Sequence, residues 1–233
     1  MIHRIILAGL LLFALISCDD DEDDDMIYQT EFSYDFNAGA DGWVGGFADY
    51  PVGEEEAYEL TFDDAMLPAP LDETEGAIML SGTNMSDDLF MYMKTGVSGL
   101  EPNTTYHVAF SVDFASDVPD GTPGVGGSPG ESVFIKAGAN TIEPAPEEDN
   151  MGYYRMNIDK GNQSQGGMDM VVLGDFSNDT DQEVYTLKTV THNGPFTVTT
   201  DGDGNAWIIV GTESGFEATT TIYYDQVRVL FSL

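Results

Sequence analysis

Apolar and polar side chains alternate along much of this chain with a period of two residues. The clearest run is Thr105–Phe114, in which every even-numbered position carries an aromatic residue or valine and every odd-numbered position a polar residue or alanine. Because successive side chains of a β-strand point to opposite faces, this run predicts a strand with one buried face. No long stretch of the body carries apolar residues at helical spacing, so the sequence predicts little or no helix.

Twelve short runs of this kind are separated by segments rich in Gly, Pro, Asn and Asp. They are Glu31–Phe36, Gly42–Phe47, Tyr58–Phe62, Ala77–Ser81, Leu89–Lys94, Thr105–Phe114, Ser132–Ala137, Tyr153–Ile158, Met168–Leu173, Glu183–Thr191, Ala206–Val210 and Thr219–Phe231. Many short strands with turn residues between them are typical of an all-β protein. We therefore expect an antiparallel two-sheet β-sandwich or jelly roll. Three long connections, Ala115–Glu131, Glu143–Asn150 and Lys160–Gly167, are candidate binding loops or mobile surface excursions.

The N-terminus differs from the body in composition. His3 and Arg4 precede an apolar run, Ile5–Ile16, which has the length of a signal-peptide core rather than of a membrane span. Residues 1–17 are therefore expected to be a signal peptide. The tetrapeptide that ends at Cys18 resembles the bacterial lipobox, which implies that Cys18 carries lipid; the alternative is a chance cysteine after an ordinary leader. A protein with two or more acyl chains is held stably at a membrane.

A run of seven acidic residues, Asp19–Asp25, follows the sole cysteine. Such a block repels itself and stays solvated, so residues 18–25 are expected to form an extended tether from the lipid. An acidic run at this place resembles the surface-export signal of some Gram-negative lineages, and in other lineages an aspartate there resembles an inner-membrane retention signal. We expect a lipid anchor in the outer membrane with the body at the cell surface, and a periplasm-facing body is the alternative.

The chain has 7 basic and 42 acidic residues, a formal net charge of −35. This charge repels phosphate groups at long range, so nucleic acid and anionic headgroups are excluded as partners, while cations and neutral ligands are favoured. The hydrophobic share of 42% suffices for one core, so we expect residues 26–233 to form a single β-sandwich domain.

Three segments resemble the carbohydrate-binding jelly-roll modules of the galactose-binding-like type. They are Tyr34–Trp43 near the start, Val97–Phe114 in the middle and Thr219–Phe231 at the end. The resemblance implies a non-catalytic glycan-binding domain whose opening and closing strands lie side by side. It also implies a structural calcium ion held by oxygen atoms of Asn37 and Asp225, with Asn37 standing where these modules usually have Glu. The alternative is that Asp225 only caps a strand turn.

Six side chains are the candidate ligand contacts. A lysine or arginine inside a predicted strand must face water, a carboxylate or a ligand, and tyrosines near loops can stack on sugar rings. One histidine shares a strand face with polar neighbours, although a structural histidine is the simpler interpretation. The set is Tyr50, Lys94, His107, Lys136, Tyr153 and Arg155.

Catalytic motifs are weak in this sequence, and we assign no catalytic residue. Ser128 lies in a literal G-x-S-x-G, but no helix is expected after it, as a nucleophile elbow requires. Residues Asp201–Asn205 begin like an EF-hand loop but lack its later ligands, so a tight turn is expected. Val133–Asn140 resembles a strand of alginate-lyase-type jelly rolls, which leaves a polysaccharide-active enzyme using Lys94, Lys136, Arg155 and His107 as one alternative. A structural or adhesion protein without a small ligand is the other.

Overall fold

The computed structural model describes residues 28–86 and 88–233. The predicted signal peptide (1–17), the lipidated Cys18 and the tether (18–25) lie outside the described residues, so they stay predictions. No helix of the described part is long and apolar enough to cross a membrane.

The described residues form fifteen strands. They are β1 (Gln29–Tyr34), β2 (Val44–Ala48), β3 (Tyr50–Pro51), β4 (Thr61–Met66), β5 (Gly76–Thr83), β6 (Phe90–Val97), β7 (Thr105–Ser116), β8 (Val133–Asn140), β9 (Pro146–Glu148), β10 (Tyr153–Met156), β11 (Val171–Asp175), β12 (Thr186–His192), β13 (Thr197–Thr199), β14 (Ala206–Ser214) and β15 (Thr219–Ser232). Each of the twelve predicted runs overlaps one of these strands. The three unpredicted strands, β3, β9 and β13, are only two or three residues long, too short to show alternation.

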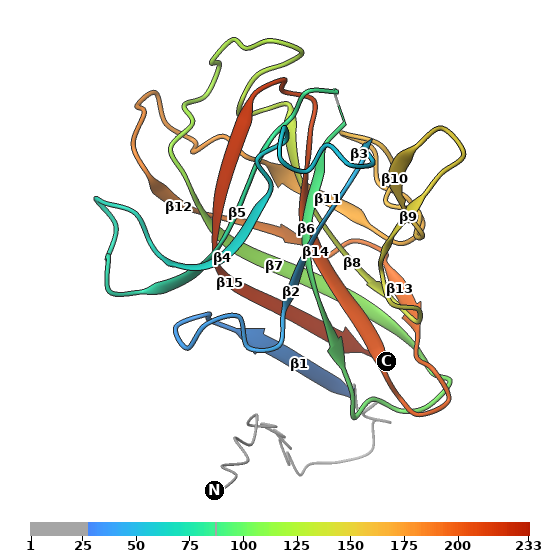
Figure 1. Cartoon of the computed structure of the whole chain (residues 1–233). Helices are drawn as coiled ribbons and strands as arrows, with labels where there is room; N and C mark the ends of the chain where they lie inside the picture. Colours follow the sequence, from blue (N-terminus) through green and yellow to red (C-terminus); the bar gives the residue numbers. More distant parts are fainter. Residues whose placement is uncertain (1–27, 87) are drawn as a thin grey trace, which may run out of the picture.

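Two antiparallel sheets build the sandwich (Figure 1). One has seven strands in the order β12-β7-β15-β5-β4, with β1 paired to β15 and β13 paired to β7; the other has five in the order β11-β8-β14-β6-β2. Consecutive strands from β5 to β8 alternate between the two sheets, as in a jelly roll. The expected all-β sandwich is therefore confirmed.

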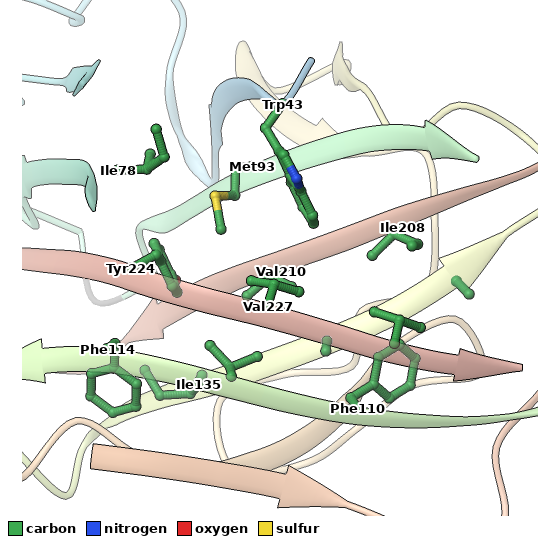
Figure 2. Close-up of a cluster of buried hydrophobic side chains, with 14 of the residues drawn as sticks. Trp43, Ile78, Met93, Phe110, Phe114, Ile135, Ile208, Val210, Tyr224 and Val227 are labelled. Atoms are coloured by element: carbon green, nitrogen blue, oxygen red, sulfur yellow. The ribbon is translucent and has the colours of Figure 1, made fainter. Parts of the chain in front are cut away.

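The core lies between these two sheets, and Figure 2 shows side chains from both of them meeting there. The even-numbered residues of β7, Tyr106 to Phe114, are all buried, as the alternation predicted. They pack with residues of the opposite sheet such as Met93, Ile208 and Val210. Burial of these apolar side chains supplies most of the driving force for folding.

The first and last strands lie side by side, as the resemblance of the two ends implied. Strand β1 pairs with the second half of β15 in antiparallel register, from Gln29 opposite Ser232 to Tyr34 opposite Val227. The register of β15 against β7 shifts between Tyr224 and Gln226, so the intervening Asp225 sits at an irregularity of the strand.

The outer face of the five-stranded sheet is covered rather than open. In β6, Met91 and Met93 face the main core, whereas Phe90 and Tyr92 face outward and are equally buried. The cover comes from the segment after β8, which carries β9 and β10. These two strands form a small three-stranded sheet with β3 (Figure 1), and Ile158 just beyond β10 packs on the outward-facing rings. This covering segment, residues 141–170, brings polar side chains to the sheet.

Candidate functional site

A cavity of about 290 Å³ opens where the covering segment meets one end of the five-stranded sheet. Its lining comes from the end of β2, the start of β6, and β10 with the loop that follows. The lining residues are Asp49, Asp88, Arg155, Met156, Ile158, Asp159, Lys160, Gly161 and Asn162. Asp49 and Asp88 are neighbours because Ala48 pairs with Phe90 across the two strands. We call this cavity the first pocket.

A chain of alternating charges runs from the first pocket into the protein. Arg155 Nη1 donates to Asp49 Oδ1 at 2.7 Å, and Lys160 Nζ lies 2.9 Å from Asp49 Oδ2. Lys160 Nζ also donates to Glu213 Oε1 at 2.5 Å, and the other oxygen of Glu213 accepts a hydrogen bond from Lys136. Three cations thus share two buried carboxylates, which fixes the positions of the pocket-lining Arg155 and Lys160.

Local backbone geometry fixes the positions of Asp49 and of the loop that carries Lys160. Asp49 has a φ of 64°, a left-handed conformation that Asp tolerates better than most residues, and its N–H donates to Tyr154 O at 2.7 Å. The Lys160 loop is closed by the Asp159 carboxylate, which accepts from Gly161 N at 3.1 Å and from Met168 N at 3.0 Å. Gly161 has a φ of 71°, and a Cβ there would lie 2.2 Å from Gln165 O, so only glycine fits.

Burial and neighbouring charges shift the protonation equilibria of the site. Burial lowers the pKa of Lys136, outweighing the attraction of Glu213. Burial acts in the same direction on Lys160, but the carboxylates of Asp49 and Glu213 outweigh it and raise its pKa. The pKa of Asp88 is raised by burial and by the charges of Asp49 and Glu213. The first pocket therefore holds a dense set of fixed donors and acceptors.

Two predicted ligand residues, Arg155 and Tyr153, lie at this end of the covering segment. Arg155 lines the first pocket and its side chain is 39% exposed, so a ligand can reach it. The guanidinium lies 5.0 Å from the centre of the Tyr153 ring, which supports it by a cation–π contact. Lys136 belongs to the same charge chain, but its side chain has no exposed surface, so it supports the site from behind instead of touching a ligand.

The other three predicted ligand residues lie elsewhere. Tyr50 is 6% exposed and packs against Tyr58 and Tyr154 as part of the core. Lys94 lies on the outer face of β6, where its Nζ donates to Glu143 at 2.7 Å and to Pro144 O at 2.6 Å.

His107 is on β7 in the seven-stranded sheet, and its neighbour Tyr106 points into the core. The imidazole therefore faces outward, on the opposite side of the sandwich from Arg155. The four side chains of the lyase alternative do not meet in one site.

Every lysine and arginine among the described residues pairs with a carboxylate. Besides the charge chain and Lys94, Lys188 pairs with Asp175 and Asp179, and Arg228 pairs with Asp113. The sequence predicted that a lysine or arginine inside a strand faces water, a carboxylate or a ligand. Lys94, Lys136 and Arg155 all face a carboxylate.

Sequence reasoning missed four members of the site: Asp49, Asp88, Lys160 and Glu213. Lys160 is the first residue of Lys160–Gly167, one of the three candidate binding loops. Glu213 is the only charged residue of β14 and follows its apolar first half, and an acid in such a strand signals a buried partner. Asp49 and Asp88 carry no local signal, because their roles depend on residues far away in the chain.

Asn37 follows β1, which pairs with β15 just beyond Asp225, but the part of the chain that the structure describes shows no metal cage. Asn37 Oδ1 accepts a hydrogen bond from Gly76 N at 2.9 Å. Asp225 is half-buried, and burial together with the charges of Glu75, Asp113 and Asp35 raises its pKa. No group of three or more His, Cys, Asp or Glu side chains among residues 28–86 and 88–233 is arranged to hold a metal ion. The calcium site stays a prediction, and a cation beside Asp225 would offset the charges that raise its pKa.

The two rejected motifs have structural explanations. Asp201 accepts hydrogen bonds from Asp203 N at 2.9 Å and from Asn205 N at 2.8 Å, so its carboxylate closes a turn between β13 and β14. Ser128 lies in the loop before β8 and donates its hydroxyl hydrogen bond to Glu131. Both motifs thus belong to turns and loops.

Comparisons with known proteins find a likeness of shape only. No family model matches the chain, and no curated protein matches it. A structure titled for the promiscuous specificity of carbohydrate-binding modules of the β-sandwich superfamily is 14% identical with a TM-score of 0.40, and covers 82% of this chain; this chain spans only 58% of that one.

The CBM22-1 xylan-binding domain of Paenibacillus barcinonensis Xyn10C is 12% identical with a TM-score of 0.37, and the match covers 86% of this chain and 92% of that one. The K3 adhesin domain of Porphyromonas gingivalis Lys-gingipain is 11% identical with a TM-score of 0.39, covering 87% and 99%. At such identities, function has to be argued from the site of this chain.

Proposed function

We propose that this protein is a non-catalytic glycan-binding β-sandwich that takes a neutral saccharide in the first pocket. The observation that carries the proposal is the fixed set of polar groups around that cavity. Asp88 supplies a carboxylate acceptor, while Arg155 and Asn162 supply donors. Sugar hydroxyls both donate and accept, so a pocket with both kinds of group at fixed positions suits them.

The charge balance of the first pocket favours a neutral ligand over an acidic one. Arg155, Lys160 and Lys136 pair with the two carboxylates of Asp49 and Glu213. Asp88 and Asp159 in the pocket lining bring the count to four carboxylates against three cations, so the site as a whole has an excess of negative charge. An acidic polysaccharide would also meet the long-range repulsion of a chain with a net charge of −35.

A non-catalytic role agrees with the distribution of candidate catalytic groups. General acid–base catalysis needs side chains within hydrogen-bond reach of one substrate. His107 and Arg155 lie on opposite sides of the sandwich, and Lys136 has no exposed surface. Incubation with alginate and pectin, followed by absorbance of unsaturated products, is the direct check; we expect no product, and product formation would contradict a purely binding role.

A glycan array with calcium present, followed by calorimetry on the best neutral glycan, tests the binding proposal. We expect Asn162→Ala, which removes a pocket donor, to weaken binding by about tenfold, the equivalent of roughly 1.4 kcal/mol. Thr61→Ala, on strand β4 of the other sheet, is the matched control and should bind like the wild type. An array without any binder would count against the proposal.

We also propose that the domain is displayed at the outer membrane by lipid on Cys18, with residues 18–25 as its tether. The lipobox resemblance and the acidic run support this placement. Metabolic labelling with an alkyne fatty acid should tag the wild type and leave Cys18→Ser unlabelled. Protease added to intact cells should then digest a surface-facing body and spare a periplasm-facing one.

A further inference from the structure

A second cavity, of about 180 Å³, lies where β7 ends and β15 begins. Its lining combines aromatic rings, hydroxyls and a single charged side chain. The lining residues are Asp117, Val118, Pro129, Phe176, Tyr185, Phe216, Thr219, Thr220 and Thr221. We call it the second pocket; it shares no residue with the first.

The long loop between β7 and β8 forms one wall, and it is held in place. Glu217 N donates to Val125 O at 2.9 Å, and Asp120 N donates to Thr180 O at 2.9 Å. A Cβ on Gly124 would lie 2.6 Å from the Phe216 ring, so loop and ring are in close contact. The second pocket is therefore a formed cavity and does not depend on ordering of the loop.

Aromatic side chains make the apolar part of the second pocket. Phe176 is 2% exposed and stacks on Phe114 in the main core, with ring centres 6.0 Å apart. Phe216 packs partly buried against the same core. Tyr185 lies edge-on to Tyr223 at 5.7 Å. These rings give a rigid surface on which a small ring-shaped ligand can pack, and their π-systems attract cations.

Asp117 is the only charged residue of the lining, and no cation of the described chain compensates it. All six described lysines and arginines pair with other carboxylates, and none of these ion pairs includes Asp117. Burial and the nearby charge of Glu183 raise the pKa of Asp117. A half-buried carboxylate without a cation is unfavourable, and a bound cation would relieve it.

We infer that the second pocket binds a small ligand bearing a protonated amine on a ring, such as an amino sugar. The ammonium group would donate to the Asp117 carboxylate, and the ring would pack on Phe216 and Tyr185. A neutral ligand of the same shape would leave Asp117 uncompensated. The high negative charge of the chain also raises the local concentration of cations.

Calorimetry with glucosamine and N-acetylglucosamine tests the inference, because the two share a ring and only the first is a cation. The wild type should bind glucosamine at least about tenfold more tightly, since charge-assisted hydrogen bonds are roughly twice as strong as neutral ones. Asp117→Asn should lose this preference, while Asn162→Ala, in the first pocket, should keep it. Asp117→Asn removes an uncompensated charge, so it should fold at least as stably as the wild type.

The outcomes separate this inference from the proposed function. Equal binding of both sugars by the wild type, or glucosamine binding unchanged in Asp117→Asn, would overturn the inference. Glucosamine binding that is lost in Asn162→Ala but kept in Asp117→Asn would place the sugar in the first pocket, which overturns the second site and supports the first.

Discussion

Arg155 Nη1 donates to Asp49 Oδ1 at 2.7 Å, a hydrogen bond between residues 106 positions apart in the sequence. The bond joins the covering segment to the edge of the five-stranded sheet. Lys160, five residues after Arg155, reaches the second oxygen of the same carboxylate. Asp49 is therefore the group on which the shape of the first pocket depends.

Replacement of Asp49 by Asn should destabilise the protein by about 3 kcal/mol, because removing one partner of a buried pair leaves the others uncompensated. Asn also tolerates the left-handed φ of 64°, so the change tests charge rather than backbone strain. Urea unfolding measures the effect. Asp63→Asn on the exposed strand β4 is the control and should change the free energy of unfolding little; equal effects would contradict this role of Asp49.

Replacement of Asp88 by Asn should stabilise the protein at neutral pH. The folded-state pKa of Asp88 is raised, so the folded protein binds its proton more tightly, and stability falls as pH rises from the ordinary Asp pKa through the raised value. Asn cannot ionise, so the variant does not lose this stability as the pH rises. The melting temperature of Asp88→Asn should exceed that of the wild type at pH 7, and the difference should vanish below the ordinary pKa. A variant that is less stable at neutral pH would contradict the assignment.

Two buried tyrosines should respond oppositely to removal of the hydroxyl. Tyr224 is fully buried, and its hydroxyl has no hydrogen-bond partner among the described residues, so Tyr224→Phe should be neutral or stabilising by about 1 kcal/mol. Tyr106 OH accepts a hydrogen bond from Glu101 N at 2.9 Å, so Tyr106→Phe should destabilise by about 1 kcal/mol. Chemical denaturation compares them directly, and a large loss in Tyr224→Phe would reveal a partner for its hydroxyl.

Calcium should raise the melting temperature if the predicted site at Asn37 and Asp225 exists. At about a hundredfold excess over the dissociation constant, binding to the folded state adds about 2.7 kcal/mol. Asp225→Asn should abolish this gain, while itself being more stable than the wild type in chelator, because the raised pKa of Asp225 marks an unfavourable charge. Identical wild-type melting curves in calcium and in chelator would refute the calcium site.

Alternation predicted the sheets because it is a local property of the sequence. The covered outer face was not predicted, because Lys94 in the same strand suggested a polar face. The first half of β6, in which Phe90 and Tyr92 alternate with Met91 and Met93, has apolar residues on both faces, as in strands that are buried on both sides. The three shortest strands, β3, β9 and β13, could not be predicted, because they are defined by the strands with which they pair and not by a pattern in their own residues.

The candidate site was only partly predictable. Arg155 could be found from its charge inside a predicted strand, and Lys160 from its loop. The pairing of both with Asp49 could not, because it depends on how residues 141–170 fold back over the sheet. His107 shares a strand face with polar neighbours, which made it a candidate ligand contact. Its strand, β7, belongs to the seven-stranded sheet, so the imidazole lies on the opposite side of the sandwich from Arg155.

Amide hydrogen exchange, with and without the best neutral glycan, tests the central claim most directly because it locates the ligand. We predict slower exchange in residues 155–162 and around Asp49, which border the first pocket, with no change in β7 or β13. Protection confined to the outer face of the seven-stranded sheet around His107, with exchange at 155–162 unchanged, would contradict the account.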